Sequence, residues 1–232
     1  DLLEKLSNDE PTLTHAIQLA FASEFFKQST PRTLMGQNYL IGEIIRRYVK
    51  EILAWDRKLT PFRYVASEKS IRTTVPIQGG QQQVQLRGFI DRVDEVGGRI
   101  RIVDYKSGKK NTFFYQVADL FDPACKDRPA SVLQLFLYSW MLSRYPRMQQ
   151  RDIAPALYSM RVLFEAGFDP TIYQKIDRGV TQPVERIQDY EAEFEANLVH
   201  CLEKIFSPEL PFVQAEEDKV CVYCAFKGIC GR

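Results

Sequence analysis

The sequence lacks a long apolar run, an excess charge of one sign and an even set of cysteines. None of its 232 residues belongs to a stretch approaching the ~20 apolar residues of a membrane span, and the first residues form no signal peptide. Its 31 basic and 30 acidic residues leave a net charge of +1, so composition alone does not indicate nucleic-acid binding. We therefore expect a soluble, cytoplasmic protein without membrane contact. A first residue that is Asp rather than Met favours a piece of a longer chain.

The cysteines are few and unevenly placed. Three of the five, Cys221, Cys224 and Cys230, lie within the last 12 residues. This pattern argues against the disulfide framework of a secreted protein and indicates a metal site in a reducing compartment. Thiolates at C-x2-C-x5-C spacing suit zinc or an iron–sulfur cluster, whereas Cys201 is expected to pack on a helix.

The spacing of apolar residues changes along the chain. The first 60 residues have helical spacing, notably over residues 14–27 and 35–59. From Phe62 the period becomes two, which indicates strands separated by Gly-Gly turns. The predicted strands are residues 63–77, 83–96, 99–106 and 155–164, and the later predicted helices are 111–121, 130–145 and 184–206.

These elements predict an α/β (α+β) fold in which a central sheet is flanked by helices. We divide the chain into a helical N-terminal region over residues 1–60, a core over residues 61–206 and a cysteine-bearing tail over residues 207–232. The length fits one elaborated domain, or one domain with an appended module.

Two acidic residues are expected to face each other across the second hairpin. A two-residue turn at Gly97-Gly98 sets the register so that Asp91 lies directly opposite Asp104. Directly opposed side chains have Cβ atoms about 4.5–5.5 Å apart, and carboxylates that close repel unless a cation or a proton lies between them. Hard oxygen ligands at this separation suit Mg²⁺ or Mn²⁺. The period of the strand places Lys106 on the same face as Asp104.

A third acid could extend this row. The same reasoning at the turn of residues 79–80 sets Glu68 opposite Asp91, although one bulge in this longer hairpin would break the register. Seven basic residues within residues 87–110 include Lys109 and Lys110, which are candidates for DNA contact. The alternative is an ordinary solvated sheet face whose acids and bases form surface ion pairs.

Three motifs in order resemble a known family. Residues 88–94, GFIDRVD, and residues 102–108, IVDYKSG, resemble the GxxDR…DYKSG core of RecB-like nucleases of the PD-(D/E)XK superfamily. Gln134 and Tyr138 then resemble the Q-x3-Y motif of that family, and their spacing places them on one helix face. The resemblance implies a restriction-endonuclease-like core with a mixed central sheet, and it implies that Gln134 and Tyr138 orient the site and the DNA backbone.

The resemblance also assigns roles to the acidic row. Asp91 and Asp104 would ligate Mg²⁺ or Mn²⁺ together with the backbone carbonyl of Tyr105, and Glu68 is a weaker candidate. Lys106 would position the attacking water or stabilise charge on the phosphate. The family's early G-x3-H motif is not matched, because its only candidate, His15, has proline where the glycine should stand.

The tail resembles the C-terminal cysteine cluster of AddB-type and CRISPR-adaptation nucleases. In those proteins three such cysteines join a fourth, upstream of the core, around a [4Fe-4S] cluster. No cysteine precedes the core here, and Cys125 lies in the wrong place. We therefore expect a cluster of Cys221, Cys224 and Cys230 that is complete only in a longer protein, and a fragment of weak activity.

These observations predict a Mg²⁺- or Mn²⁺-dependent deoxyribonuclease. The resemblance implies the exonuclease part of a helicase–nuclease that acts on DNA double-strand breaks, with DNA and a helicase–nuclease subunit, or the rest of a larger chain, as partners. One alternative is a non-catalytic DNA-binding scaffold with the nuclease fold. Another is a regulatory or assembly domain whose tail is a redox-sensitive group of thiols.

Overall fold

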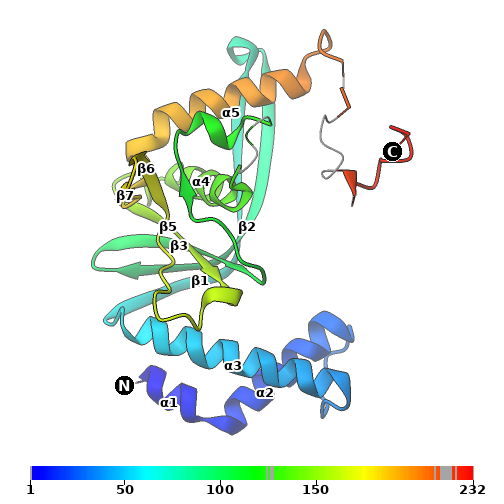
Figure 1. The fold of residues 1–232 in the computed structure, drawn as a ribbon, viewed down its shortest axis with the longest axis vertical. Coiled ribbons are helices and arrows are strands. Elements are labelled where there is room, and N and C mark those ends of the chain that lie inside the picture. Colours follow the sequence, from blue (N-terminus) through cyan, green and yellow to red (C-terminus); the bar gives the residue numbers. More distant parts are fainter. Residues whose placement is uncertain are drawn as a thin grey trace.

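The protein folds around one mixed four-stranded sheet (Figure 1). The computed structural model describes residues 2–123, 125, 128–211, 213–214, 221–222 and 224–231. The sheet has the order β1-β2-β3-β5, formed by Phe62–Ile77, Gln82–Val96, Arg99–Lys106 and Ile153–Ser159. The first three strands are antiparallel and β5 runs parallel to β3, which makes the sheet mixed as predicted.

The hairpin registers follow from the glycine turns. Gly97 and Gly98 have φ values of 58° and 82°, which glycine adopts without a steric penalty, and they join β2 to β3. The pairs then run from Val96 with Arg99 to Arg92 with Val103, in the predicted register. In the first hairpin the predicted register also holds from Ile77 past the middle of β1, and it shifts only between Tyr64 and Ala66.

Helices cover both faces of the sheet. Figure 1 shows α3 along one face, with α1 and α2 on its outer side, and α4 with α5 on the opposite side. The bounds of these helices are Leu2–Asn8 for α1, Glu10–Ala20 for α2, Gln37–Arg57 for α3, Ala130–Ser143 for α4 and Glu191–Phe206 for α5. A π-helical turn, Phe21–Phe25, continues α2. None of the helices in the described ranges is both long and apolar enough to cross a membrane.

The two faces of the sheet have separate apolar cores. The larger core gathers Val93, Ile100 and Ile102 with α4 and α5, and it includes the fully buried Phe136 and Phe194. The helix α4 is apolar around most of its circumference because it lies between the sheet and α5. Phe89, which its strand period predicts on this core face together with Val93, is instead 47% exposed. Its neighbours Gly88 and Ile90 face the larger core, so the alternation of side chains changes between Ile90 and Val93.

A buried ionic network joins α3 to the other face. Arg92 donates to Asp56 of α3 over 2.5 Å and lies 2.6 Å from Asp94, which in turn accepts two hydrogen bonds from Arg101. The hydroxyl of Tyr158 donates to the second oxygen of Asp56 over 2.9 Å. Asp56, Arg92 and Asp94 are at most 8% exposed, so this network lies away from water and depends on mutual pairing.

A second, smaller sheet was not predicted. It has the order β4-β6-β7, formed by Phe113–Phe114, Tyr173–Asp177 and Val180–Pro183. The prediction of a helix over residues 111–121 is therefore wrong, since this segment contributes β4 and a short 3₁₀ turn, Ala118–Leu120. The cause is tertiary, because β4 pairs with β6, a strand about 60 residues further along the chain.

Candidate active site

A row of polar side chains crosses the sheet on the face that carries α4. Strand alternation places Asp104 and Lys106 of β3 on the same side as Ile102, which belongs to the larger core. Asp104 is only 2% exposed. Asp91 of β2 is half-buried, and its carboxylate accepts a hydrogen bond of 2.8 Å from the backbone N–H of Tyr105. The structure thus brings the two predicted acids together at the end of a core face.

Lys106 closes the row on one side. Its Nζ lies 2.9 Å from each carboxylate oxygen of Asp104, although only Oδ1 has hydrogen-bond geometry. The same ammonium group donates to Oε1 of Gln134 on α4 over 2.9 Å. Lys106 is therefore fixed between an acid on its own strand and an amide on the helix above.

Burial alters the acid strength of Asp104. Desolvation raises the pKa of its carboxyl above 3.8, the nearby charge of Asp91 raises it further, and Lys106 opposes both effects. Because burial and Asp91 disfavour the ionised form of Asp104, a second positive charge, in addition to Lys106, would stabilise that form. The electrostatics agree with a site that gathers a cation between Asp91 and Asp104.

Helix α4 supplies the remaining predicted pair. Nε2 of Gln134 donates to the hydroxyl of Tyr138 over 3.0 Å, one turn further along the helix. Gly88 of β2 lies against the Tyr138 ring, since a Cβ atom at residue 88 would come within 2.5 Å of Cε1. The absence of a side chain at Gly88 lets the ring approach β2. The chain Lys106–Gln134–Tyr138 is thereby continuous.

The donor set suits a hard divalent cation. Asp91 and Asp104 offer carboxylate oxygens from adjacent strands, and Oδ2 of Asp104 is buried without a hydrogen-bond partner in the described structure. Oxygen-rich sites that leave positions for water and phosphate are typical for Mg²⁺. No group of three or more His, Cys, Asp or Glu side chains in the described ranges could hold a metal ion, so Glu68 does not complete a three-acid cluster.

The weaker candidates lie outside this row. Glu68 is exposed and has a left-handed backbone with φ of 46°, between two residues that keep the predicted register with β2. His15 is exposed on α2. Lys109 and Lys110 are exposed just beyond β3, where they border a cavity with Asn111.

The tail cysteines are not gathered into a metal site. A turn joins Cys221 and Cys224 through a backbone hydrogen bond of 3.1 Å, and Cys230 is exposed. All five cysteines are free thiols. The three tail thiols as placed do not fit a cluster, because they belong to no metal-holding group within the part of the chain that is described.

One functional candidate escaped the sequence analysis. Ser159, at the end of β5, is 2% exposed, and strand pairing places it beside Lys106. The parallel pairing of β5 with β3 brings Ser159 next to Lys106, and the sequence alone does not give this pairing. The sequence signal for Ser159 was weak, because a serine that follows an apolar stretch is equally typical of the start of a loop.

The sheet, its covering helices and this acid–acid–lysine row define a class of protein. The family model of the PD-(D/E)XK nuclease superfamily matches residues 1–231. The chain therefore belongs to the PD-(D/E)XK nuclease superfamily, and its mixed sheet flanked by helices has the restriction-endonuclease-like fold. Members of the superfamily are generally nucleases, and these nucleases typically use divalent metals, which indicates a metal-dependent nuclease.

The chain also resembles a solved structure. The structure titled "Crystal structure of SSO0001" is 14% identical in sequence, with a TM-score of 0.38 over 99% of this chain and 94% of that chain. No protein of curated function matches the sequence significantly.

Proposed function

We propose that this chain is a Mg²⁺- or Mn²⁺-dependent deoxyribonuclease domain whose reacting groups are Asp91, Asp104 and Lys106. The observation that supports it best is the double hold on Lys106, by Asp104 on its own strand and by Gln134 on α4. An ammonium group fixed beside two carboxylates suits hydrolysis of a phosphodiester. A surface ion pair would leave the lysine free to move.

Each residue has a separate part in this proposal. Asp91 and Asp104 would hold the cation with the backbone carbonyl of Tyr105; when bound, the cation supplies a Lewis acid and lowers the pKa of water. Lys106 would hold the attacking water or stabilise negative charge on the phosphate. Gln134 orients Lys106, and Tyr138 orients Gln134. Lys109 and Lys110 would contact the DNA backbone.

The wider role is also a proposal. The motifs GFIDRVD and IVDYKSG, followed by Gln134 and Tyr138, favour a RecB-like or AddB-like exonuclease acting in the cytoplasm on double-strand breaks, with a helicase as partner. A [4Fe-4S] cluster on Cys221, Cys224 and Cys230 would need a fourth ligand and a rearranged tail. Iron and acid-labile sulfide measured in the protein purified without oxygen would test it, since zinc or no metal would contradict it.

Cleavage of DNA with and without divalent metal tests the activity. Asp104→Asn and Lys106→Ala are expected to lower the Mg²⁺-dependent rate by at least ~100-fold, the effect of removing a group that stabilises the transition state. Lys204→Ala, which removes an exposed lysine on α5, is the control and should leave the rate unchanged. Cleavage that persists in both site variants would reject the proposed roles.

A second candidate is a DNA-binding scaffold without catalysis. The observation that favours it is that only two acids gather at the site in the described structure, without a third acid or a histidine. A scaffold would bind DNA equally well with and without Mg²⁺ and would not cut it at any metal concentration. Metal-dependent cleavage lost in Asp104→Asn would exclude it.

A further inference from the structure

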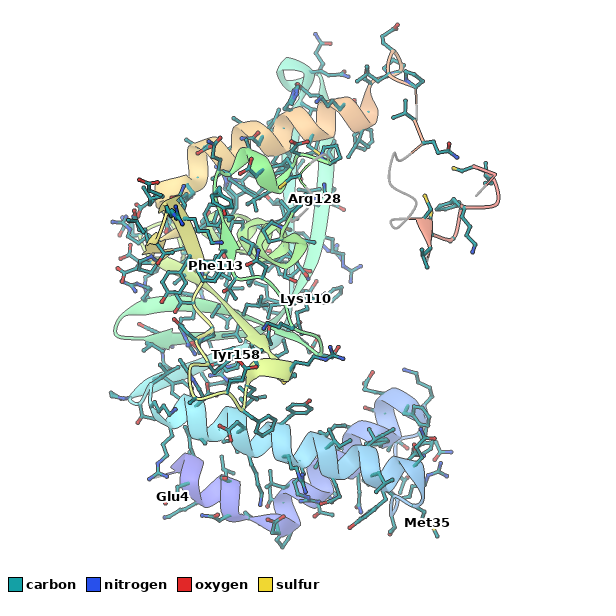
Figure 2. The ribbon with its side chains drawn as sticks, in the orientation of Figure 1. Glu4, Met35, Lys110, Phe113, Arg128 and Tyr158 are labelled. Atoms are coloured by element: carbon teal, nitrogen blue, oxygen red, sulfur yellow. The ribbon has the colours of Figure 1, made fainter. Side chains whose placement is uncertain are left out.

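A cavity of about 680 Å³ borders β5, the strand next to the one that carries Asp104 and Lys106. It lies between the end of β5 and the small sheet, and Figure 2 marks two residues of its wall, Lys110 and Phe113. Leu157 and Ser159 of β5 line it, and they pair with Asp104 and Lys106. Paired residues of neighbouring strands point to the same face of a sheet, so Leu157 and Ser159 lie on the face of the proposed reacting groups.

Ser159 indicates that the cavity takes a polar ligand. Its Oγ is buried and has no hydrogen-bond partner in the described structure, while the residue itself is 2% exposed. A buried hydroxyl without a partner is unfavourable, and native proteins rarely keep one without a reason. Rotation of the Ser159 side chain toward the cavity would let a ligand atom satisfy it, on the strand position paired with Lys106.

One wall of the cavity is aromatic. Phe113 of β4 and Tyr173 of β6 pair across the small sheet, and their rings stack with centroids 5.7 Å apart and an angle of 25° between the planes. Phe168 also lines the cavity. The Nζ of Lys175 lies 5.0 Å from the centre of the Phe113 ring. Aromatic faces next to cations are the usual platform for unpaired nucleobases.

Both cationic and acidic residues border the cavity. Lys109 and Lys110 border it where the chain leaves β3, whereas Glu165 and Asp169 border it elsewhere. Both oxygens of Asp169 are engaged, by the hydroxyl of Tyr173 over 2.6 Å and by the N–H of Thr171 over 2.9 Å. Glu165 is exposed. A phosphate would favour the two lysines, and the amino groups of a base would favour Glu165.

We infer that this cavity binds one unpaired nucleotide of the DNA strand, with its base on the aromatic wall and its phosphate toward Lys109 and Lys110. Its volume lies in the range of small-ligand sites, and a base inside a duplex would have to leave its stack to enter. The domain would therefore prefer single-stranded or frayed DNA. This inference rests on the proposed nuclease function and names the substrate of the same site.

Binding measured in EDTA tests the cavity without cleavage. A fluorescent single strand is compared by anisotropy with a strand of equal length whose nucleotides all lack bases. The abasic strand should bind about 5- to 150-fold more weakly, the range that ~1–3 kcal/mol of stacking per base gives at tenfold per 1.4 kcal/mol. Phe113→Ala should weaken only the normal strand, whereas Tyr64→Ala, which removes an exposed aromatic ring on β1, should weaken neither.

Ser159→Ala provides a second variant, which tests the cavity even if Phe113→Ala fails to fold. Because the Ser159 hydroxyl lacks a partner, its removal should leave the melting temperature equal or higher while weakening the normal strand about 3- to 10-fold. Equal binding of normal and abasic strands would overturn the inference. An equal loss of both strands in Phe113→Ala would do the same.

Cleavage in Mg²⁺ separates this inference from the function beneath it. A single strand should be cut at least ~10-fold faster than a blunt duplex of the same sequence, because the duplex must first unpair. If no DNA is cut, the nuclease proposal fails and the binding measurements still judge the cavity. If DNA is cut but a duplex is preferred, the cavity inference alone is wrong.

Discussion

Removal of the Asp56 carboxylate should destabilise the protein far more than removal of an exposed one. Asp56 accepts hydrogen bonds from Arg92 and from Tyr158, and its side chain is 3% exposed. Burial alone would lower the pKa of the Arg92 guanidinium, but the hydrogen bond to Asp56 and the nearby negative charge raise it above its ordinary value. Because an arginine side chain is effectively never deprotonated in a protein, Arg92 stays charged when Asp56 is gone.

The expected loss follows from what remains around Arg92. Its Nη2 lies 2.6 Å from Asp94, but without hydrogen-bond geometry, and Asp94 already holds Arg101. Asp94 cannot replace the bond that Asp56 accepts. Breaking one partner of a buried pair costs about 3–5 kcal/mol, against a total of about 5–15 kcal/mol for a domain.

Urea denaturation of Asp56→Ala measures this loss directly. The control is Glu185→Ala, which breaks an exposed pair with Arg99 at 3.2 Å and should cost about 0–1 kcal/mol. Asp56→Asn should fall between the two, because it keeps one acceptor. A loss below about 1 kcal/mol for Asp56→Ala, equal to the control, would refute the view that this network anchors α3 to the sheet.

Two further predictions concern the site. Because the pKa of Asp104 is raised in the folded protein, the stability that this carboxyl contributes is present below pH ~3.8 and is lost as pH rises through the folded pKa. Asp104→Asn should therefore raise the melting temperature at pH 7 while abolishing cleavage. A lower melting temperature would contradict the argument from burial. Gly88→Ala should destabilise the protein by about 1–3 kcal/mol and lower cleavage, because its Cβ would displace the Tyr138 ring. Gly108→Ala, whose nearest neighbour would be 4.0 Å away, should be nearly neutral in urea denaturation, and an equal loss in both variants would exclude the steric explanation.

The strands and the acid pair could be predicted because their information is local. A change of period and two Gly-Gly turns predicted β1, β2 and β3 to within one residue, and the turns also set the registers. The strand predicted over residues 155–164 is displaced, since β5 covers Ile153–Ser159 and a 3₁₀ turn follows it. Local patterns therefore predicted that Asp91, Asp104 and Lys106 lie close together, and the contacts of Asp104 with Lys106 and of Asp91 with Tyr105 agree with this.

The small sheet could not be predicted because its information is distant. The strand β4 has only two residues, too few to show a period, and it exists through pairing with β6. The cavity beside the site combines β4 and β6 with the end of β5, so Ser159 had no visible role in the sequence. The helix predicted over residues 184–206 begins too early, because a 3₁₀ turn, Ile187–Tyr190, precedes α5, which starts at Glu191.

The alternation of side chains along β2 constrains how this hairpin can evolve. Near the end of β2, Val93 belongs to the core that contains α4, whereas Arg92 and Asp94 belong to the ionic network with Asp56 of α3. A single residue inserted or deleted between Asp94 and the turn at Gly97 would exchange these two sets at once, turning the charged side chains toward the apolar core and Val93 toward the ionic network. Insertions or deletions in β2 should therefore preserve the fold only in steps of two residues, or at the glycine turns, where the strands no longer pair.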